Sequence, residues 1–274
     1  MRPVNFKKSV SSNKLNLISF ISLLLISLII NGNAVAAEWT IIHAGKLLSV
    51  PGEPVLTEKS IVIKAGTIER IVDGYIKSTE LGAVKPEDVS LIDLSDFFVL
   101  PGLIDMHTHL SLEITPRLRY EGVERSQAYR ALRGARNAKR TLDVGITTVR
   151  NVGGGQEMLA LRDAIAENLV IGPRVFAVGG GIGVTGGHMD THGLLPEVTD
   201  LIARPEICDG VAECRHSARL LIRKGADHIK IATTGGVVSE SGAGLNQQMF
   251  EDEIKAIVDT AHSMNRKVAA HAHG

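Results

Sequence analysis

The chain has 274 residues and carries 30 basic and 30 acidic side chains, so its formal net charge is zero. Aromatic residues make up only 4% of the chain. A nucleic-acid-binding surface needs a basic patch, and this composition offers no such field, so we exclude a nucleic-acid partner. The composition is typical of a glycine-rich globular enzyme that acts on a small molecule.

Residues 1–37 have the features of a signal peptide. Three lysines precede an apolar run at 17–30, and small residues follow it. The run has 14 residues, fewer than the roughly 20 that span a bilayer, so we expect cleavage near Ala36 or Ala37 and no stable membrane anchor. Cleavage would leave 26 basic residues against 30 acidic ones, a net charge of −4. The destination would be the periplasm or the medium.

Residues 38–100 predict a small β-sandwich unit. Runs rich in β-branched residues alternate with turn signals, and Ala65-Gly66 indicates a hairpin inside one of them. The strand-like segments are 40–50, 60–72 and 91–100.

From residue 101 onward, strand-like runs alternate with helical ones. The strands are expected at 102–107, 146–151, 174–178, 228–233 and 267–271, and the helices near 123–143, 156–168, 211–224 and 247–264. This alternation predicts parallel strands with right-handed crossovers, in a doubly wound sheet or a barrel. Polar, histidine-bearing strand ends favour the barrel, where all carboxyl ends meet at one mouth. The predicted fold class is α/β, a partial (β/α)8 TIM barrel with about five of eight βα units.

The barrel region, 101–274, holds 174 residues, against about 250 in a complete barrel. We therefore expect the sequence to be a C-terminally truncated part of a longer protein and to be inactive by itself.

The first predicted barrel strand ends in two histidines. Asp105, His107 and His109 share one strand face, because side chains alternate along a strand. Two such imidazoles can chelate one divalent cation, with an acid behind them to orient a ring. The alternative is two ordinary histidines near a strand end, since this spacing is common.

Two later strands add candidate ligands. Lys230 lies among apolar neighbours, where burial lowers the pKa of an amine. The neutral amine can react with carbon dioxide to give a carbamate, an anionic metal ligand; the alternative is a lysine that extends to solvent from a strand end. His271 and His273 share a strand face, and one of them could complete the metal shell or only orient a ligand.

Two further residues are candidates for substrate binding. Gly181, Gly183 and Gly186 match a dinucleotide-binding pattern, but histidines and a proline follow where a helix would have to begin. These glycines more simply let a loop approach a ligand and place His188 at the mouth, unless His188 only structures the loop. Arg150 could bind a substrate carboxylate or form a salt bridge to a loop.

Cys208 and Cys214 are six residues apart. The sequence is compatible with a disulfide between them and with two free thiols. No P-loop or nucleophile-elbow motif occurs. The remaining histidines are expected to be solvated or locally bonded: His43, His192, His216, His228 and His262.

Five segments together resemble the amidohydrolase superfamily, and most closely its prolidase-like (Xaa-Pro dipeptidase) branch. They are PGLIDMHTHL, GITTVRNVGG, GGHMDTHG, ADHIKIATTGGV and VAAHAHG. The resemblance implies two divalent metal ions, usually zinc, at the barrel mouth. It makes His107 and His109 ligands of the more buried ion and a carboxylated Lys230 the bridging ligand. It makes His271, rather than His273, the ligand from the fifth strand.

The resemblance also implies an activity. A hydroxide bridging the two metals would hydrolyse the C–N bond of a dipeptide or an N-acyl amino acid. The family's sixth-strand histidine and its eighth-strand aspartate, the proton shuttle, have no counterpart here, so no catalytic acid or base is assigned. The alternatives are an imidazolonepropionase-like cyclic amide hydrolase, a lactone hydrolase, and a non-catalytic periplasmic metal-binding barrel. A homo-oligomeric full-length form also stays open.

Overall fold

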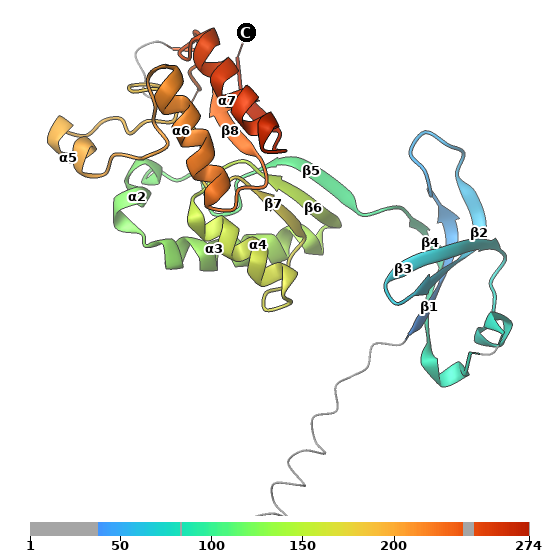
Figure 1. The fold of residues 1–274 in the computed structure, drawn as a ribbon. Coiled ribbons are helices and arrows are strands. Elements are labelled where there is room, and N and C mark those ends of the chain that lie inside the picture. Colours follow the sequence, from blue (N-terminus) through green and yellow to red (C-terminus); the bar gives the residue numbers. More distant parts are fainter. Residues whose placement is uncertain (1–37, 83, 238–243, 274) are drawn as a thin grey trace, which may run out of the picture. The chain divides into compact units, whose positions relative to one another are not determined.

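The computed structural model describes residues 38–82, 84–237 and 244–273 (Figure 1). The predicted signal peptide, 1–37, lies outside the described residues. The chain divides into two compact units whose boundary falls between Pro101 and Gly102, and each is described here by itself. Among the described helices, none is long and apolar enough to cross a membrane.

The N-terminal unit is a four-stranded sheet. Its strands are β1 (Trp39–Leu47), β2 (Leu56–Lys64), β3 (Thr67–Asp73) and β4 (Val89–Val99), with short 3-10 turns η1 (Ser78–Leu81) and η2 (Pro86–Asp88) before β4. The order is β3-β2-β1-β4, with β1 and β4 parallel and the other pairs antiparallel. The Ala65-Gly66 turn joins β2 to β3, as predicted, and both residues have positive φ.

The β-sandwich expected for residues 38–100 stays a prediction. A sandwich has two sheets packed face to face, and the described strands of residues 39–99 form one. Ala44, Leu47 and Ile61 form a buried cluster on this sheet, and Ile41 and Val62, which pair across β1 and β2, are also buried. Apolar side chains elsewhere in the unit, such as Phe97 and Ile68, stay exposed. The sequence could not distinguish these two environments, because both use apolar residues in strands.

The described part of the second unit contains five strands, which pair in parallel. They are β5 (Leu103–Thr108), β6 (Ile146–Asn151), β7 (Arg174–Ala177), β8 (Ile229–Ala232) and β9 (Val268–His271). Strands β5-β6-β7 form one sheet and β8-β9 another. The segment after β7 links the two, because Ile182 forms a parallel bridge with Ile231. The carboxyl ends of neighbouring strands therefore lie at one edge.

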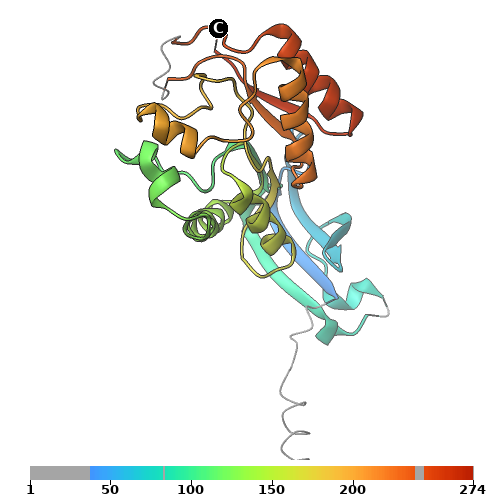
Figure 2. The same ribbon diagram turned by 60° about the vertical axis from the view of Figure 1, so that its left-hand side comes forward.

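Helices alternate with these strands (Figures 1 and 2). They are α2 (Glu121–Glu124), α3 (Gln127–Asp143), α4 (Gln156–Ala166), α5 (Pro196–Leu201), α6 (Gly210–Arg223) and α7 (Glu251–Ser263), with a 3-10 turn η3 (Leu118–Tyr120). Helices α3 and α4 pack together against β6 and β7, and α6 and α7 pack together beside β8. The α/β class is as predicted. The short helix α5 was not expected, and the count of five barrel units among eight stays a prediction.

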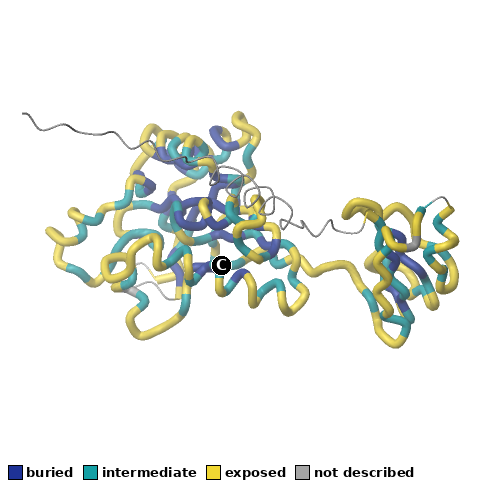
Figure 3. Tube along the Cα trace, turned by 90° about the horizontal axis from the view of Figure 1, so that it is seen from below, coloured by how far each residue is buried: buried dark blue, intermediate teal, exposed yellow. Residues whose placement is uncertain are grey.

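Two apolar cores hold the second unit together, one under each helix pair. The buried stretches of the chain lie inside the unit (Figure 3). The core between α3, α4 and the first sheet includes Val149, Met158 and Val175. The core under α6 and α7 includes Leu221 and Ile257.

Cys208 and Cys214 form a disulfide, with Cα atoms 5.0 Å apart. It joins Cys208, two residues before the start of α6, to the second turn of that helix. The backbone N–H of Cys208 also donates to the carbonyl oxygen of Gly183 (2.9 Å), so this crosslinked segment is fixed to the chain that follows β7. The disulfide alternative left open by the sequence is therefore the one that the structure adopts.

The core under α6 predicts a stability difference between two leucines. Leu221 is 0% exposed and Leu201, on α5, is 85% exposed. Leu221→Ala should lower the free energy of unfolding by about 2–5 kcal/mol, because it leaves a cavity. Leu201→Ala should change it by less than about 0.5 kcal/mol. Urea denaturation followed by circular dichroism measures both, and equal effects would contradict this account of the core.

Candidate metal centre

The end of β5 places two imidazole nitrogens side by side. Nε2 of His107 lies 3.4 Å from Nε2 of His109. Two nitrogens bound to one tetrahedral zinc at 2.0–2.1 Å are about 3.4 Å apart, so the pair has the spacing of two ligands on one ion. Asp105 does not orient either ring. Its carboxylate accepts from the backbone N–H of His107 (2.9 Å).

Lys230 lies in the interior of β8, with 2% of its surface exposed. Among the described residues its amine makes no hydrogen bond or ion pair. Burial, followed by the charge of Arg150, lowers the pKa of the amine. The side chain therefore does not extend to solvent, and its environment favours the neutral, nucleophilic form.

Three further histidines gather beside β8 and β9. The rings of His188 and His271 are stacked with centroids 4.2 Å apart, and His273 meets His271 edge-on at 4.8 Å. Nε2 of His271 donates to the carbonyl oxygen of Gly235 (3.2 Å), which leaves a lone pair on Nδ1. Nδ1 of His188 is buried and has no hydrogen-bond partner within the described part of the chain.

These groups share one electrostatic environment. Burial, followed by the neighbouring imidazole of His107, lowers the pKa of His109 to about 4. Burial, followed by His271, lowers the pKa of His188 to about 4. The Lys230 amine lowers the pKa of both, and also those of His107 and His271. All four rings are therefore biased toward the neutral form that binds metal ions.

The nitrogen groups near β5, β8 and β9 are suited to a divalent ion, but the structure does not bring them into one complete coordination site. In residues 38–273, as far as they are described, no group of three or more His, Cys, Asp and Glu side chains is close enough to hold a metal. The structure instead brings together a His107–His109 pair and a cluster of His188, His271 and His273, with Lys230 in the field of both. Imidazoles, with a carbamate if Lys230 is carboxylated, are ligands that zinc accepts.

Arg150 makes a hydrogen bond that neither interpretation of the sequence anticipated. Its Nε donates to the carbonyl oxygen of Met106 (2.7 Å), so it ties β6 to β5. Within the described residues it forms no salt bridge. Its role as a substrate ligand therefore stays a proposal, while its charge acts on Lys230.

His228 is a correction to the expectation of a solvated or locally bonded histidine. It is buried, and its Nε2 has no hydrogen-bond partner among the residues that the structure describes. Burial, followed by the charge of Arg150, lowers its pKa to about 4. The alternation of side chains could have signalled this, because His228 is two residues before Lys230 and so lies on the same face.

Glycines allow loops to lie against two of the rings. A Cβ atom at Gly153 would overlap Nδ1 of His109, and one at Gly236 would overlap the ring of His188. Only glycine permits these approaches. The sequence had suggested that Gly181, Gly183 and Gly186 let a loop approach a ligand, and it gave Gly153 and Gly236 no such role.

The loop that carries His188 is held at several points. Arg204 donates to the carbonyl oxygens of Gly181 and Met189 (both 3.0 Å). The backbone N–H of His188 donates to Oε1 of Gln248 (2.8 Å). The loop is therefore a structured element and can present His188 in a defined position.

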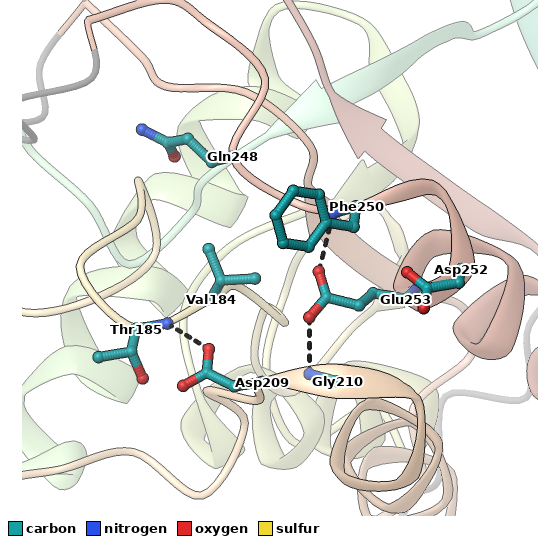
Figure 4. Close-up of a pocket in the computed structure, with 8 residues that line it drawn as sticks. All are labelled: Val184, Thr185, Asp209, Gly210, Gln248, Phe250, Asp252 and Glu253. Carbon is teal, nitrogen blue, oxygen red and sulfur yellow. Dashed lines mark hydrogen bonds between the residues drawn. The ribbon is translucent and has the colours of Figure 1, made fainter.

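A cavity of about 430 Å³ lies beside this loop, at the N-terminal ends of α6 and α7 (Figure 4). Its carboxylates bind backbone: Glu253 accepts from Gly210 and Phe250, and Asp209 accepts from Thr185. None of the sequence-predicted site residues lines it. The lining residues are Val184, Thr185, Asp209, Gly210, Gln248, Phe250, Asp252 and Glu253.

Residues 98–274 match the Amidohydrolase family. Over 259 residues the chain is 32% identical to ochratoxinase from Aspergillus niger, an alignment that covers 87% of this chain and 51% of that protein. The chain thus spans about half the length of the curated relatives it matches.

Solved structures agree with this match. A Xaa-Pro dipeptidase with bound methionine superposes with a TM-score of 0.75 and 36% identity, covering 86% of this chain and 57% of the other. A prolidase in complex with N-methylphosphonate-L-proline gives a TM-score of 0.72 and 32% identity, covering 86% and 56%. The resemblance inferred from the five sequence segments is confirmed. The chain belongs to the amidohydrolase family.

Proposed function

We propose that the protein is a metal-dependent hydrolase of C–N bonds. The observation that carries this proposal is the pairing of His107 Nε2 and His109 Nε2 at 3.4 Å, together with a buried Lys230 whose charge lowers the pKa of both rings. Members of the amidohydrolase family generally use divalent metal ions, which supports a metal role for these residues.

The proposed ligands are His107, His109, Lys230 and His271, and the proposed ions are two divalent metals, with zinc the best match to nitrogen donors. When bound, such ions polarise an amide carbonyl and lower the pKa of water. The protein's part is to present neutral imidazoles and a buried amine. His109 does this through a pKa of about 4, which keeps its ring unprotonated at neutral pH.

The proposed substrate is a dipeptide or an N-acyl amino acid. The names of the solved relatives, a Xaa-Pro dipeptidase and a prolidase, support this class. We place His188, His273 and Arg150 at the substrate. His188 and His273 belong to the cluster around His271, and His188 lies on the loop that Arg204 and Gln248 hold. A homo-oligomeric state remains a further proposal.

Loss of a ligand tests this function. His107→Ala should lower zinc affinity and hydrolysis by more than about 100-fold, the upper end for residues that only orient a ligand. His262→Ala, on an exposed face of α7, is the matched control and should bind and turn over normally. Metal analysis and a panel of dipeptides, N-acyl amino acids, cyclic amides and lactones measure this in protein expressed from its complete reading frame. Undiminished turnover by the metal-free enzyme would refute the proposal.

Carboxylation of Lys230 is separately testable. Its neutral amine would add to carbon dioxide and lose a proton, giving a carbamate. With ¹³C-bicarbonate and zinc, the wild-type protein should show a carbamate carbonyl resonance in its ¹³C NMR spectrum. Lys230→Arg keeps a long basic side chain but cannot form the carbamate, so the resonance should vanish. A resonance of equal intensity in both proteins would assign it to another amine.

We also propose that the protein is exported. The signal-peptide features of residues 1–37 and the Cys208–Cys214 disulfide both support a periplasmic or secreted location, because disulfides persist in oxidising compartments. Mass spectrometry of the protein from the producing cell should find a mature N-terminus at Ala37 or Glu38. A full-length protein confined to the cytoplasm would contradict export.

A further inference from the structure

Asn151 is a polar side chain in an apolar core. It is the last residue of β6 and is 0% exposed, beside Val149 and the other core residues under α3 and α4. An amide buried without partners costs free energy, so its position requires specific hydrogen bonds. The sequence analysis gave Asn151 no role.

The Asn151 amide joins the two backbone segments that flank the ring of His109. Its Oδ1 accepts from the backbone N–H of Leu110 (2.8 Å), the residue after His109. Its Nδ2 donates to the carbonyl oxygen of Gly153, whose Cα lies against His109 Nδ1. One side chain thus fixes both the chain that carries the ring and the turn that lies against it.

The surrounding contacts make this arrangement rigid. Nδ2 of Asn137, on α3, donates to the carbonyl oxygen of Leu110 (2.9 Å), so both polar groups of Leu110 are bonded to asparagines. The N–H of Val152 donates to the carbonyl oxygen of Thr108 (2.9 Å), which joins β5 and β6 beyond Asn151. The backbone on both sides of His109 is therefore held by hydrogen bonds, which limits the rotation of its ring.

The chemistry of the two partners selects an amide. Leu110 offers a donor and Gly153 offers an acceptor, and an amide carries one acceptor and one donor group. A carboxylate could satisfy Leu110 but would face the Gly153 carbonyl with no proton to donate. An apolar side chain would satisfy neither and would leave two buried backbone groups unpaired.

We infer that Asn151 is a positioning residue that holds the His109 ring so that its Nε2 lies beside Nε2 of His107 for metal binding. This inference rests on the proposed function, because it needs His109 to bind a divalent ion. Residues that orient a metal ligand typically contribute 10–100-fold to metal affinity.

The test measures zinc affinity of the metal-free protein by competition with a chromophoric chelator. Asn151→Ala should weaken binding about 10–100-fold. Asn151→Asp, which keeps the bond to Leu110, should weaken it less. The absorption spectrum of bound cobalt(II) should also change in both variants, because the ligand geometry changes. A purely structural role would leave that spectrum unaltered.

Ser217→Ala is the matched control. Ser217 is also buried, and its hydroxyl donates to the carbonyl oxygen of Pro205 (3.2 Å), in a region held by α6. This variant loses a buried hydrogen bond away from the histidines, so it should lose stability in EDTA while its zinc affinity stays within about twofold.

The outcomes separate the two proposals. If the wild-type protein binds no zinc, the proposed function fails and this inference fails with it. If the wild type binds zinc and a folded Asn151→Ala binds it within about twofold, only the inference fails. If Asn151→Ala does not fold, the zinc affinities of Asn151→Asp and Gly153→Ala test the inference instead. Gly153→Ala forces the turn away from the ring and should weaken binding, and wild-type affinity in both would overturn the inference.

Discussion

The second unit is organised around an unfavourable arrangement: the Lys230 amine lowers the pKa values of a set of imidazoles, and no described acidic side chain pairs with that amine. Groups that can each carry a positive charge repel one another, and burial adds to the penalty on the charged forms. The rings of His109 and His188 are held neutral by their lowered pKa values, and burial shifts the pKa of Lys230 in the same direction. Neutral nitrogens with free lone pairs stabilise the fold little, but they are the ligands that a divalent ion requires.

Uncharged contacts hold these groups in place. Gly153 and Gly236 allow backbone to lie against two of the rings, and the Asn151 amide joins the segments on either side of His109. The loop of His188 is held by Gln248, which bonds to its backbone, and by Arg204, whose charge is paired with Glu206. The glycine and amide contacts fix direction without adding charge, which suits a site whose own groups repel one another. The disulfide contributes by fixing the segment that bonds to Gly183.

Much of the second unit could be predicted because its elements carry local signals. The run at 146–151 is rich in β-branched residues and corresponds to β6, and the helical run at 211–224 corresponds to α6 within one residue. Helix α5 was missed because it is short and lies among glycines and prolines. Whether a second sheet covers the sheet of the N-terminal unit could not be predicted, since apolar strand residues look alike in both cases.

The sequence by itself determined which strands carry nitrogen donors and that His107 shares a face with His109, because the two-residue period of a strand sets side-chain direction locally. It left open whether Lys230 is buried or extends to solvent, and the structure buries it. Only the tertiary structure decided what touches those side chains. The bond between Leu110 and Asn151 spans 41 residues, and Arg150 turned out to bond the neighbouring strand. Such contacts depend on how segments far apart in the sequence pack together, and a local sequence pattern does not specify which segments meet.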